Sequence, residues 1–215
     1  MDNSSWKHLT NNATLKTYPQ DTVIYRQSER PHFVFLVKSG RVVLDAYGLN
    51  GKKRSIYIAD KGTCFGELSC LDESTNFCTA TTNVKTELYL ISQKNFIKEI
   101  HNNADFCMSL LKSFSIKTRL IAELLTQMSF DDSNSRVYHT LSSLIQQYGI
   151  LITHGHYKLN IKFTHQEMAH LTGLSRVSVS NIFINLTKRG LIEKENGYLI
   201  IKDIHLLENY LINDI

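Results

Sequence analysis

The stretch THQEMAHLTGLSRVSVSNIFINLTKRG, Thr164 to Gly190, decides the fold of the C-terminal part of the chain. Thr164 followed three residues later by Glu167 is a capping box, which marks the start of a helix. Gly173 supplies the positive-φ residue of a tight turn, and Ser175 caps a second helix. Two short helices joined by a glycine turn predict a helix-turn-helix.

The second helix has a buried stripe of Val179, Ile182 and Leu186, which leaves small and polar side chains on its other face. On that face an arginine can bond guanine, an asparagine can pair with adenine, and a valine can contact a thymine methyl group. Double-stranded DNA is therefore the predicted partner, with a wing formed by the hairpin around Asn196-Gly197. The residues predicted to contact bases or phosphates are Thr164, His165, Gln166, Ser175, Arg176, Val177, Ser178, Ser180, Asn181 and Lys188.

Residues from about 14 to 92 alternate apolar and polar side chains in short runs separated by glycines, which is typical of antiparallel hairpins. One of these predicted strands is TCFGELS, residues 63–69. The fold class is thus α+β: an N-terminal antiparallel β-roll resembling a jelly roll, a long dimerisation helix, and a C-terminal winged helix-turn-helix. We predict domains at residues 1–103 (roll with flanking short helices), 104–132 (long helix and hinge) and 133–215 (DNA binding), ending in a helix over 203–214.

Residues 104–128 contain neither glycine nor proline and show a seven-residue apolar repeat. A second apolar row passes either through Leu110 and Leu124 or through Leu111 and Leu125, with Lys117 or Thr118 as a polar residue in mid-row. This helix packs on its own domain alone, or it also pairs with its copy, and we favour a homodimer. The predicted dimer residues are Cys107, Phe114, Thr118, Ile121, Leu125 and Met128.

The composition of the 215 residues indicates a globular protein with a net charge of +4, which suits an anionic partner without requiring one. No apolar signal core and no run of about eighteen apolar residues is present, so we expect a cytoplasmic protein with no membrane contact. No phosphate-binding loop, dinucleotide fingerprint, zinc-protease motif or nucleophile elbow occurs. We therefore predict no catalytic residues and no enzymatic activity.

The four cysteines, Cys64, Cys70, Cys78 and Cys107, are expected to be reduced and to serve as small buried apolar residues. A thiol redox switch is the alternative. We predict no metal and no cofactor, since the histidine pair at positions 154 and 156 lacks a third ligand.

The order of these parts, together with four motifs, resembles the Crp/Fnr family of bacterial transcription regulators over residues 14–205. The motifs are VFLVKSGRVVLD (34–45), GTCFGELSCLDES (62–74), MSFDDSNSRVYHTL (128–141) and FTHQEMAHLTGLSRVSVSNIFINLTKRGLI (163–192). The resemblance implies a homodimer that binds a palindromic operator, and RNA polymerase as a further partner if the protein activates transcription. A module that binds a ligand and acts through protein partners is the alternative.

The resemblance also implies an effector pocket, but this chain departs from the members that bind cyclic AMP. Those members follow FGEL with an Arg-Ser pair on the phosphate, whereas Asn76-Phe77 and Cys78 stand there in this chain. Ile121-Ala122 replace a Thr-Ser pair on the long helix. We therefore expect an unknown small-molecule effector other than cyclic AMP, or none. The candidate pocket residues are Gly66, Glu67, Leu68, Cys78, Lys117 and Ile121, and Lys117, Arg119 and Arg54 are weaker candidates for an anion site.

The recognition helix departs from its relatives as well. Many relatives read bases with Arg, Glu and a later Arg, and here Arg176 matches the first, Val177 replaces the Glu and Asn181 replaces the later Arg. Losing the acidic acceptor removes a contact to cytosine, and valine favours a thymine methyl group. We expect a half-site richer in A and T.

Overall fold

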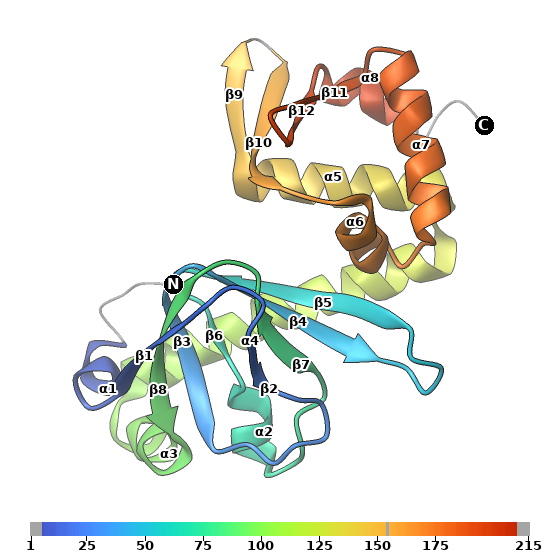
Figure 1. Cartoon of the computed structure of the whole chain (residues 1–215). Helices are drawn as coiled ribbons and strands as arrows, with labels where there is room; N and C mark the ends of the chain where they lie inside the picture. The colour runs from blue at the N-terminus through green and yellow to red at the C-terminus, as the bar shows by residue number, and fades with distance from the viewer. Residues whose placement is uncertain (1–5, 154, 210–215) are drawn as a thin grey trace. The chain divides into compact units, whose positions relative to one another are not determined.

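The computed structural model describes residues 6–153 and 155–209 (Figure 1). It consists of two compact units, Met1–Ile121 and Ala122–Ile215, and each is described here by itself. The division falls within the long helix α4 (Ala104–Phe130).

The first unit contains eight strands in two antiparallel four-stranded sheets, with strand orders β1-β8-β3-β6 and β2-β7-β4-β5. This arrangement confirms the predicted β-roll. Its strands are β1 (Thr14–Tyr18), β2 (Val23–Tyr25), β3 (Phe33–Ser39), β4 (Arg41–Tyr47), β5 (Lys53–Asp60), β6 (Cys64–Phe65), β7 (Thr79–Thr82) and β8 (Thr86–Ser92), and its short helices are α1 (Lys7–Asn11), α2 (Glu67–Asp72) and α3 (Gln93–Asn102).

The β3–β4 hairpin depends on Gly40. Its φ of 91° lies in the left-handed region, and a Cβ at this position would collide with Thr86. The hairpin brings Val37 and Val42, both fully buried, into one apolar cluster with Phe65 and Leu88. A glycine at this turn is therefore required for the roll to close.

The predicted strand over residues 63–69 is wrong beyond Phe65. Gly66 adopts a left-handed conformation with φ 81°, and helix α2 starts at the next residue. Glu67, Ser69 and Cys70 then face inward on one side of this helix. Positions 67 and 69 alternate as in a strand, so the alternation did not reveal the helix.

Of the two apolar rows of helix α4, the row through Leu110 faces the roll. Phe106, Leu110 and Ser113 are buried, and Phe106 and Leu110 belong to an apolar cluster of the roll that Phe114 also contacts. The row of Leu111, Thr118 and Leu125 is exposed instead. The helix thus buries one stripe within its own unit and leaves a second apolar stripe uncovered in the single chain.

The second unit packs its helices against one antiparallel sheet of order β11-β12-β10-β9 (Figure 1). Its core includes Leu141, Leu159, Met168, Val179 and Leu186. The residues of the predicted terminal helix beyond Glu208 largely lie outside the described part, and His154 of the predicted histidine pair does too. The elements are α5 (Ser133–Tyr148), β9 (Gly149–Thr153), β10 (His156–Lys162), α6 (His165–Thr172), α7 (Arg176–Lys188), β11 (Ile192–Glu195), β12 (Tyr198–Ile201) and α8 (Ile204–Glu208).

Candidate DNA-binding site and effector pocket

Helix α6 begins with the predicted capping box. The Thr164 hydroxyl accepts a hydrogen bond from the Glu167 backbone N–H at 3.1 Å, and the Thr164 backbone N–H donates to the Glu167 carboxylate at 2.7 Å. Two of the helix's unpaired N–H groups are thereby satisfied. The capping box makes Thr164 the N-cap of α6, and this sets the directions in which the side chains of His165 and the following residues point.

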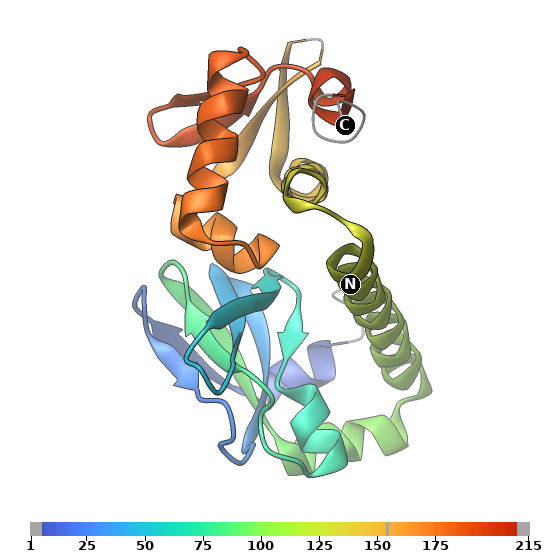
Figure 2. The ribbon, with the colours of Figure 1, turned by 90° about the vertical axis from the view of Figure 1, so that its right-hand side faces the viewer.

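The turn between α6 and α7 also follows the prediction. Gly173 has φ 71° and donates its N–H to the Ala169 carbonyl at 2.9 Å. The Ser175 hydroxyl accepts from the Ser178 N–H at 3.0 Å and caps α7. Figure 2 shows α7 in orange, running from this turn along the hairpin β11–β12.

Helix α7 buries Val179, Ile182 and Leu186, as the predicted stripe requires. Arg176, Val177 and Asn181 are exposed near the N-terminal end, and Val177 is 69% exposed. An exposed valine between polar groups at a helix start suits contact with a thymine methyl group. Ser180 is the exception on this face, since it is only half exposed.

Ser180 is partly covered by the His165 side chain. The His165 Nδ1 atom lies 2.9 Å from the Ser180 hydroxyl, and the imidazole packs against the Phe183 ring with 5.2 Å between centroids. Burial lowers the pKa of His165, and Lys194 and Arg176 lower it further. The two cations, Lys194 and Arg176, give the surroundings of His165 the positive charge that a phosphate group requires.

The predicted wing is present as the hairpin of β11 and β12. Asn196 and Gly197 both have positive φ, 50° and 84°, the combination that a two-residue type I′ turn needs. The hairpin is held near its turn, where Lys158 and Lys162 lie over the Tyr198 ring at 5.0 and 4.9 Å. Thr164, Gln166 and Lys188 are exposed around the same helices.

A second candidate site is a small cavity of about 60 Å³ inside the roll. It brings together five of the six predicted effector-pocket residues: Gly66, Glu67, Leu68, Lys117 and Ile121. Cys78 is fully buried and lies behind the lining, with its sulfur 3.9 Å from the Tyr25 hydroxyl. Tyr25 and Tyr57 line the cavity and were missed, because an aromatic residue in a strand ordinarily indicates core packing.

Lys117 does not offer a free cation to this cavity. Its Nζ donates to the Glu67 Oε1 atom at 2.6 Å and to the Cys64 carbonyl at 2.8 Å, and it lies 5.4 Å from the centre of the Tyr57 ring. Burial lowers the pKa of Lys117, but Cys64 and Glu67 outweigh it and the net shift is upward. The other two candidates for an anion site, Arg119 and Arg54, are not among the residues that line this cavity.

Three of the four cysteines are buried, as expected. Burial raises the pKa of Cys64 to about 12, of Cys70 to about 11 and of Cys78 to about 12, while Cys107 is half-buried. Within residues 6–153 and 155–209, no group of three or more His, Cys, Asp or Glu side chains is arranged to hold a metal ion. The helices described include none long and apolar enough to cross a membrane.

These pKa shifts predict slow thiol chemistry in the folded protein. At pH 8 iodoacetamide should modify at most Cys107 within the time that modifies all four cysteines in urea, because the thiolate is the nucleophile. The native rate at the other three should still be rising about tenfold per pH unit at pH 9. Mass spectrometry of peptides counts the modified sites, and rapid labelling of Cys64, Cys70 or Cys78 at pH 8 would contradict the buried arrangement.

Comparisons with known proteins agree with this architecture. Residues 15–103 match the family model described as cyclic nucleotide-binding domain, and residues 135–210 match the Crp-like helix-turn-helix domain. The chain is 28% identical over 194 residues to the cyclic AMP receptor protein of Thermus thermophilus, covering 90% of this chain and 86% of the relative. It is 24% identical over 191 residues to the anaerobic regulatory protein of Bacillus subtilis, covering 88% and 80%.

Solved structures share the fold. A CooA mutant from Carboxydothermus hydrogenoformans superposes with a TM-score of 0.81 at 21% identity, covering 95% of this chain and 90% of that one. The regulator CLP of Xanthomonas campestris superposes with a TM-score of 0.79 at 18% identity, covering 93% and 99%. The curated relatives are regulators and not enzymes. With both family models matched in order and the helix-turn-helix in place, the chain belongs to the Crp/Fnr family of transcription regulators, which bind DNA through this motif.

Proposed function

We propose that the protein is a homodimer that binds a palindromic DNA operator and regulates transcription in the cytoplasm. The observation that carries the proposal is the exposed group of Arg176, Val177 and Asn181 at the capped start of α7. This helix start also points positive backbone N–H groups outward, which favours phosphate nearby. If the regulator activates transcription, RNA polymerase is a further partner.

The recognition residues define the expected half-site. Arg176 would bond a guanine and Asn181 an adenine, while Val177 would contact a thymine methyl group. Phosphate contacts from Thr164, Gln166 and Lys188 fix the position on the duplex without reading sequence. The half-site should therefore contain one guanine among A·T pairs.

Selection from random duplexes tests the proposal. Purified protein at near-physiological salt, where non-specific phosphate binding is weak, should enrich a palindrome with half-sites about 34 Å apart. Enrichment of a single, unrepeated half-site would contradict the dimer. Absence of any enrichment, both alone and with cell extract added to supply an effector, would contradict sequence-specific binding.

The dimer is supported by the uncovered stripe on α4. Leu111, Ile121, Leu125 and Met128 are each about half exposed or more, and this helix is about 40 Å long at 1.5 Å per residue. Two such stripes packed together would bury the apolar surface that the roll leaves bare. Thr118 lies mid-stripe, where a polar residue restricts the register.

Leu125→Asp should raise the dimer dissociation constant by about 100-fold, because a two-fold interface would then bury two unpaired carboxylates. Size-exclusion chromatography with light scattering at micromolar concentration measures the change. Thr126→Asp is the matched control, since it adds the same charge to an exposed neighbouring position on α4. A dimer that resists Leu125→Asp would place the interface elsewhere.

The effector is proposed to differ from cyclic AMP, or to be absent. The cavity in the roll is small, and its one lysine is already paired with Glu67. A buried cyclic phosphate would lack a cation there and would lie near the Glu67 carboxylate, which is costly. The name of the Thermus thermophilus relative mentions cyclic AMP, but in this chain Asn76, Phe77 and Ile121 line the cavity in place of the Arg-Ser and Thr-Ser pairs of the members that bind cyclic AMP.

Isothermal titration of the full-length protein with cyclic AMP should therefore give no saturable heat below about 100 µM, equivalent to a binding free energy weaker than roughly −5.5 kcal/mol. The Thermus thermophilus receptor protein serves as the control in the same buffer. Micromolar binding by this chain would show that the Lys117–Glu67 pair opens to admit a phosphate.

A further inference from the structure

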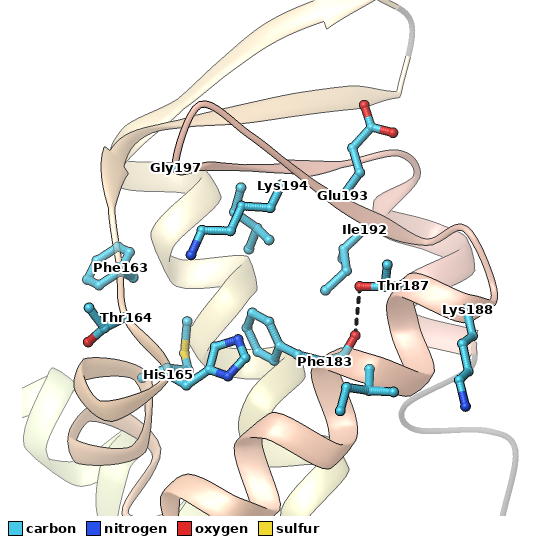
Figure 3. A pocket seen from close by; sticks show the side chains of 13 residues that line it. Phe163, Thr164, His165, Phe183, Thr187, Lys188, Ile192, Glu193, Lys194 and Gly197 are labelled. Carbon is cyan, nitrogen blue, oxygen red and sulfur yellow. Dashed lines mark hydrogen bonds between the residues drawn. The ribbon is translucent and has the colours of Figure 1, made fainter.

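The second unit contains a larger cavity that the DNA-binding proposal does not use. Its volume is about 300 Å³, and it lies between the start of α6, one side of α7 and the wing (Figure 3). This volume is at the lower end of the range that holds small organic ligands. The lining residues are Phe163, Thr164, His165, Met168, Phe183, Ile184, Thr187, Lys188, Ile192, Glu193, Lys194, Gly197 and Leu199.

The wall of this cavity is mainly apolar. Phe163 lines it from the loop between β10 and α6, Met168 from α6, Phe183 from α7 and Leu199 from β12. Met168 is almost completely buried and belongs to the core of the unit, so this wall is held in place by packing. An apolar ligand surface placed here would leave water at a gain of about 25 cal/mol per Å².

The rim of the cavity is positive. The Lys194 side chain extends over the cavity toward His165, whereas Lys188 points away at the other end (Figure 3). The one acidic lining residue, Glu193, also points away in Figure 3 and is neutralised by Lys202, with 2.7 Å between carboxylate and ammonium. Lys194 and His165 both line the cavity, and Figure 3 shows their nitrogen atoms on the same side of it.

We propose that this cavity binds a small amphipathic monocarboxylate, with its chain or ring among Phe163, Met168 and Leu199 and its carboxylate between Lys194 and His165. Charge complementarity selects a carboxylate, since the accessible charge at this end is positive and Glu193 is occupied. The apolar wall favours such a ligand over inorganic anions, and the Lys194 ammonium favours it over uncharged apolar molecules.

The site would also oppose DNA binding, a consequence that rests on the proposed function. Thr164, His165 and Lys188 line this cavity and are among the residues proposed to contact phosphate. A carboxylate at Lys194 and His165 would take the place of a DNA phosphate group, so ligand and operator would compete for one positive rim.

Methyl NMR of the full-length protein labelled at its four methionines tests the site directly. Octanoate should shift the Met168 methyl signal saturably, while Met108 and Met128 on α4 report any non-specific effect. Met168→Leu assigns the signal. No shift of Met168, an equal response to octylamine, or an equal response to inorganic phosphate would each overturn the proposal.

Variants of the cavity lining test whether octanoate binds at this position. Lys194→Gln should weaken octanoate binding at least fivefold, whereas Lys158→Gln, on the neighbouring strand β10 and outside the cavity, should change it less than twofold. Leu199→Phe fills the cavity from the apolar side and should also weaken binding. Unchanged affinity in both Lys194→Gln and Leu199→Phe would place octanoate elsewhere and overturn the proposal.

An operator-binding measurement separates the ligand site from the proposed function. Octanoate at saturation should weaken operator binding at least threefold in the wild type and should have a smaller effect in Lys194→Gln. If Met168 reports binding and operator affinity is unchanged, the ligand site stands and the phosphate contact of His165 is wrong. If the protein binds no operator under any condition, the NMR result still decides the ligand site.

Discussion

Replacing Arg176 by alanine should lower operator affinity by about 5- to 150-fold, which corresponds to roughly 1–3 kcal/mol. Arg176 is the first residue of α7 and is exposed beside Val177. A bidentate bond from its guanidinium to guanine would be lost, so the variant should also stop discriminating at one base position in each half-site. Titration of the wild-type operator and of single-base variants measures both effects.

Two further variants separate base reading from charge. Arg176→Lys retains a cation for phosphate but loses the fork geometry, so it should lose discrimination and retain more affinity than alanine. Arg30→Ala removes the same charge from an exposed loop of the roll and should leave operator affinity within about twofold. If Arg176→Ala weakens all sequences equally, Arg176 contacts phosphate and the proposed orientation of α7 is wrong.

Replacing Lys117 by methionine should lower the unfolding free energy of the roll by about 3–5 kcal/mol. Methionine keeps most of the buried stem but removes the ammonium that pairs with Glu67, whose side chain is only 3% exposed. Glu67 would then be a buried carboxylate without a cation, and breaking a buried pair from one side is the costly change. Urea unfolding followed by tryptophan fluorescence measures it, since the single tryptophan, Trp6, packs on Phe106 within this unit.

The double variant Lys117→Met with Glu67→Gln is the control for this effect. Removing both charges avoids the unpaired carboxylate, so the double variant should recover at least half of the lost stability. If the single and double variants are equally unstable, the loss comes from packing of the lysine stem and not from charge. Lys112→Met, at an exposed position on α4, should change stability by less than about 0.5 kcal/mol.

The helix-turn-helix could be predicted because its determinants are local. Thr164 and Glu167 lie three residues apart, and Gly173 needs no distant partner to adopt its positive φ. The strands of the roll were also readable, since one face of each is buried and alternation follows. Helix α2 was missed because the left-handed Gly66 reverses the chain within a run that alternates like a strand.

The interior of the roll could not be predicted in the same way. Lys117 and Glu67 are 50 residues apart, and their pairing depends on how α4 packs against α2. A lysine on a long helix is usually solvated, and nothing in its neighbours distinguishes it. The sequence left the two apolar rows of α4 open for the same reason, because the choice depends on which row meets Phe96 and Phe106 in the folded roll.

The ammonium of Lys117 acts toward Glu67 as an internal ligand tethered to the same fold. A tethered group has an effective concentration in the millimolar range or above, whatever the protein concentration. Any molecule that enters the roll and uses Glu67 must displace this group, so its apparent affinity is reduced by that competition. A small cationic metabolite must therefore approach the effective concentration of the Lys117 ammonium before it can displace that group from Glu67. At lower concentrations it would leave the roll and its long helix unchanged.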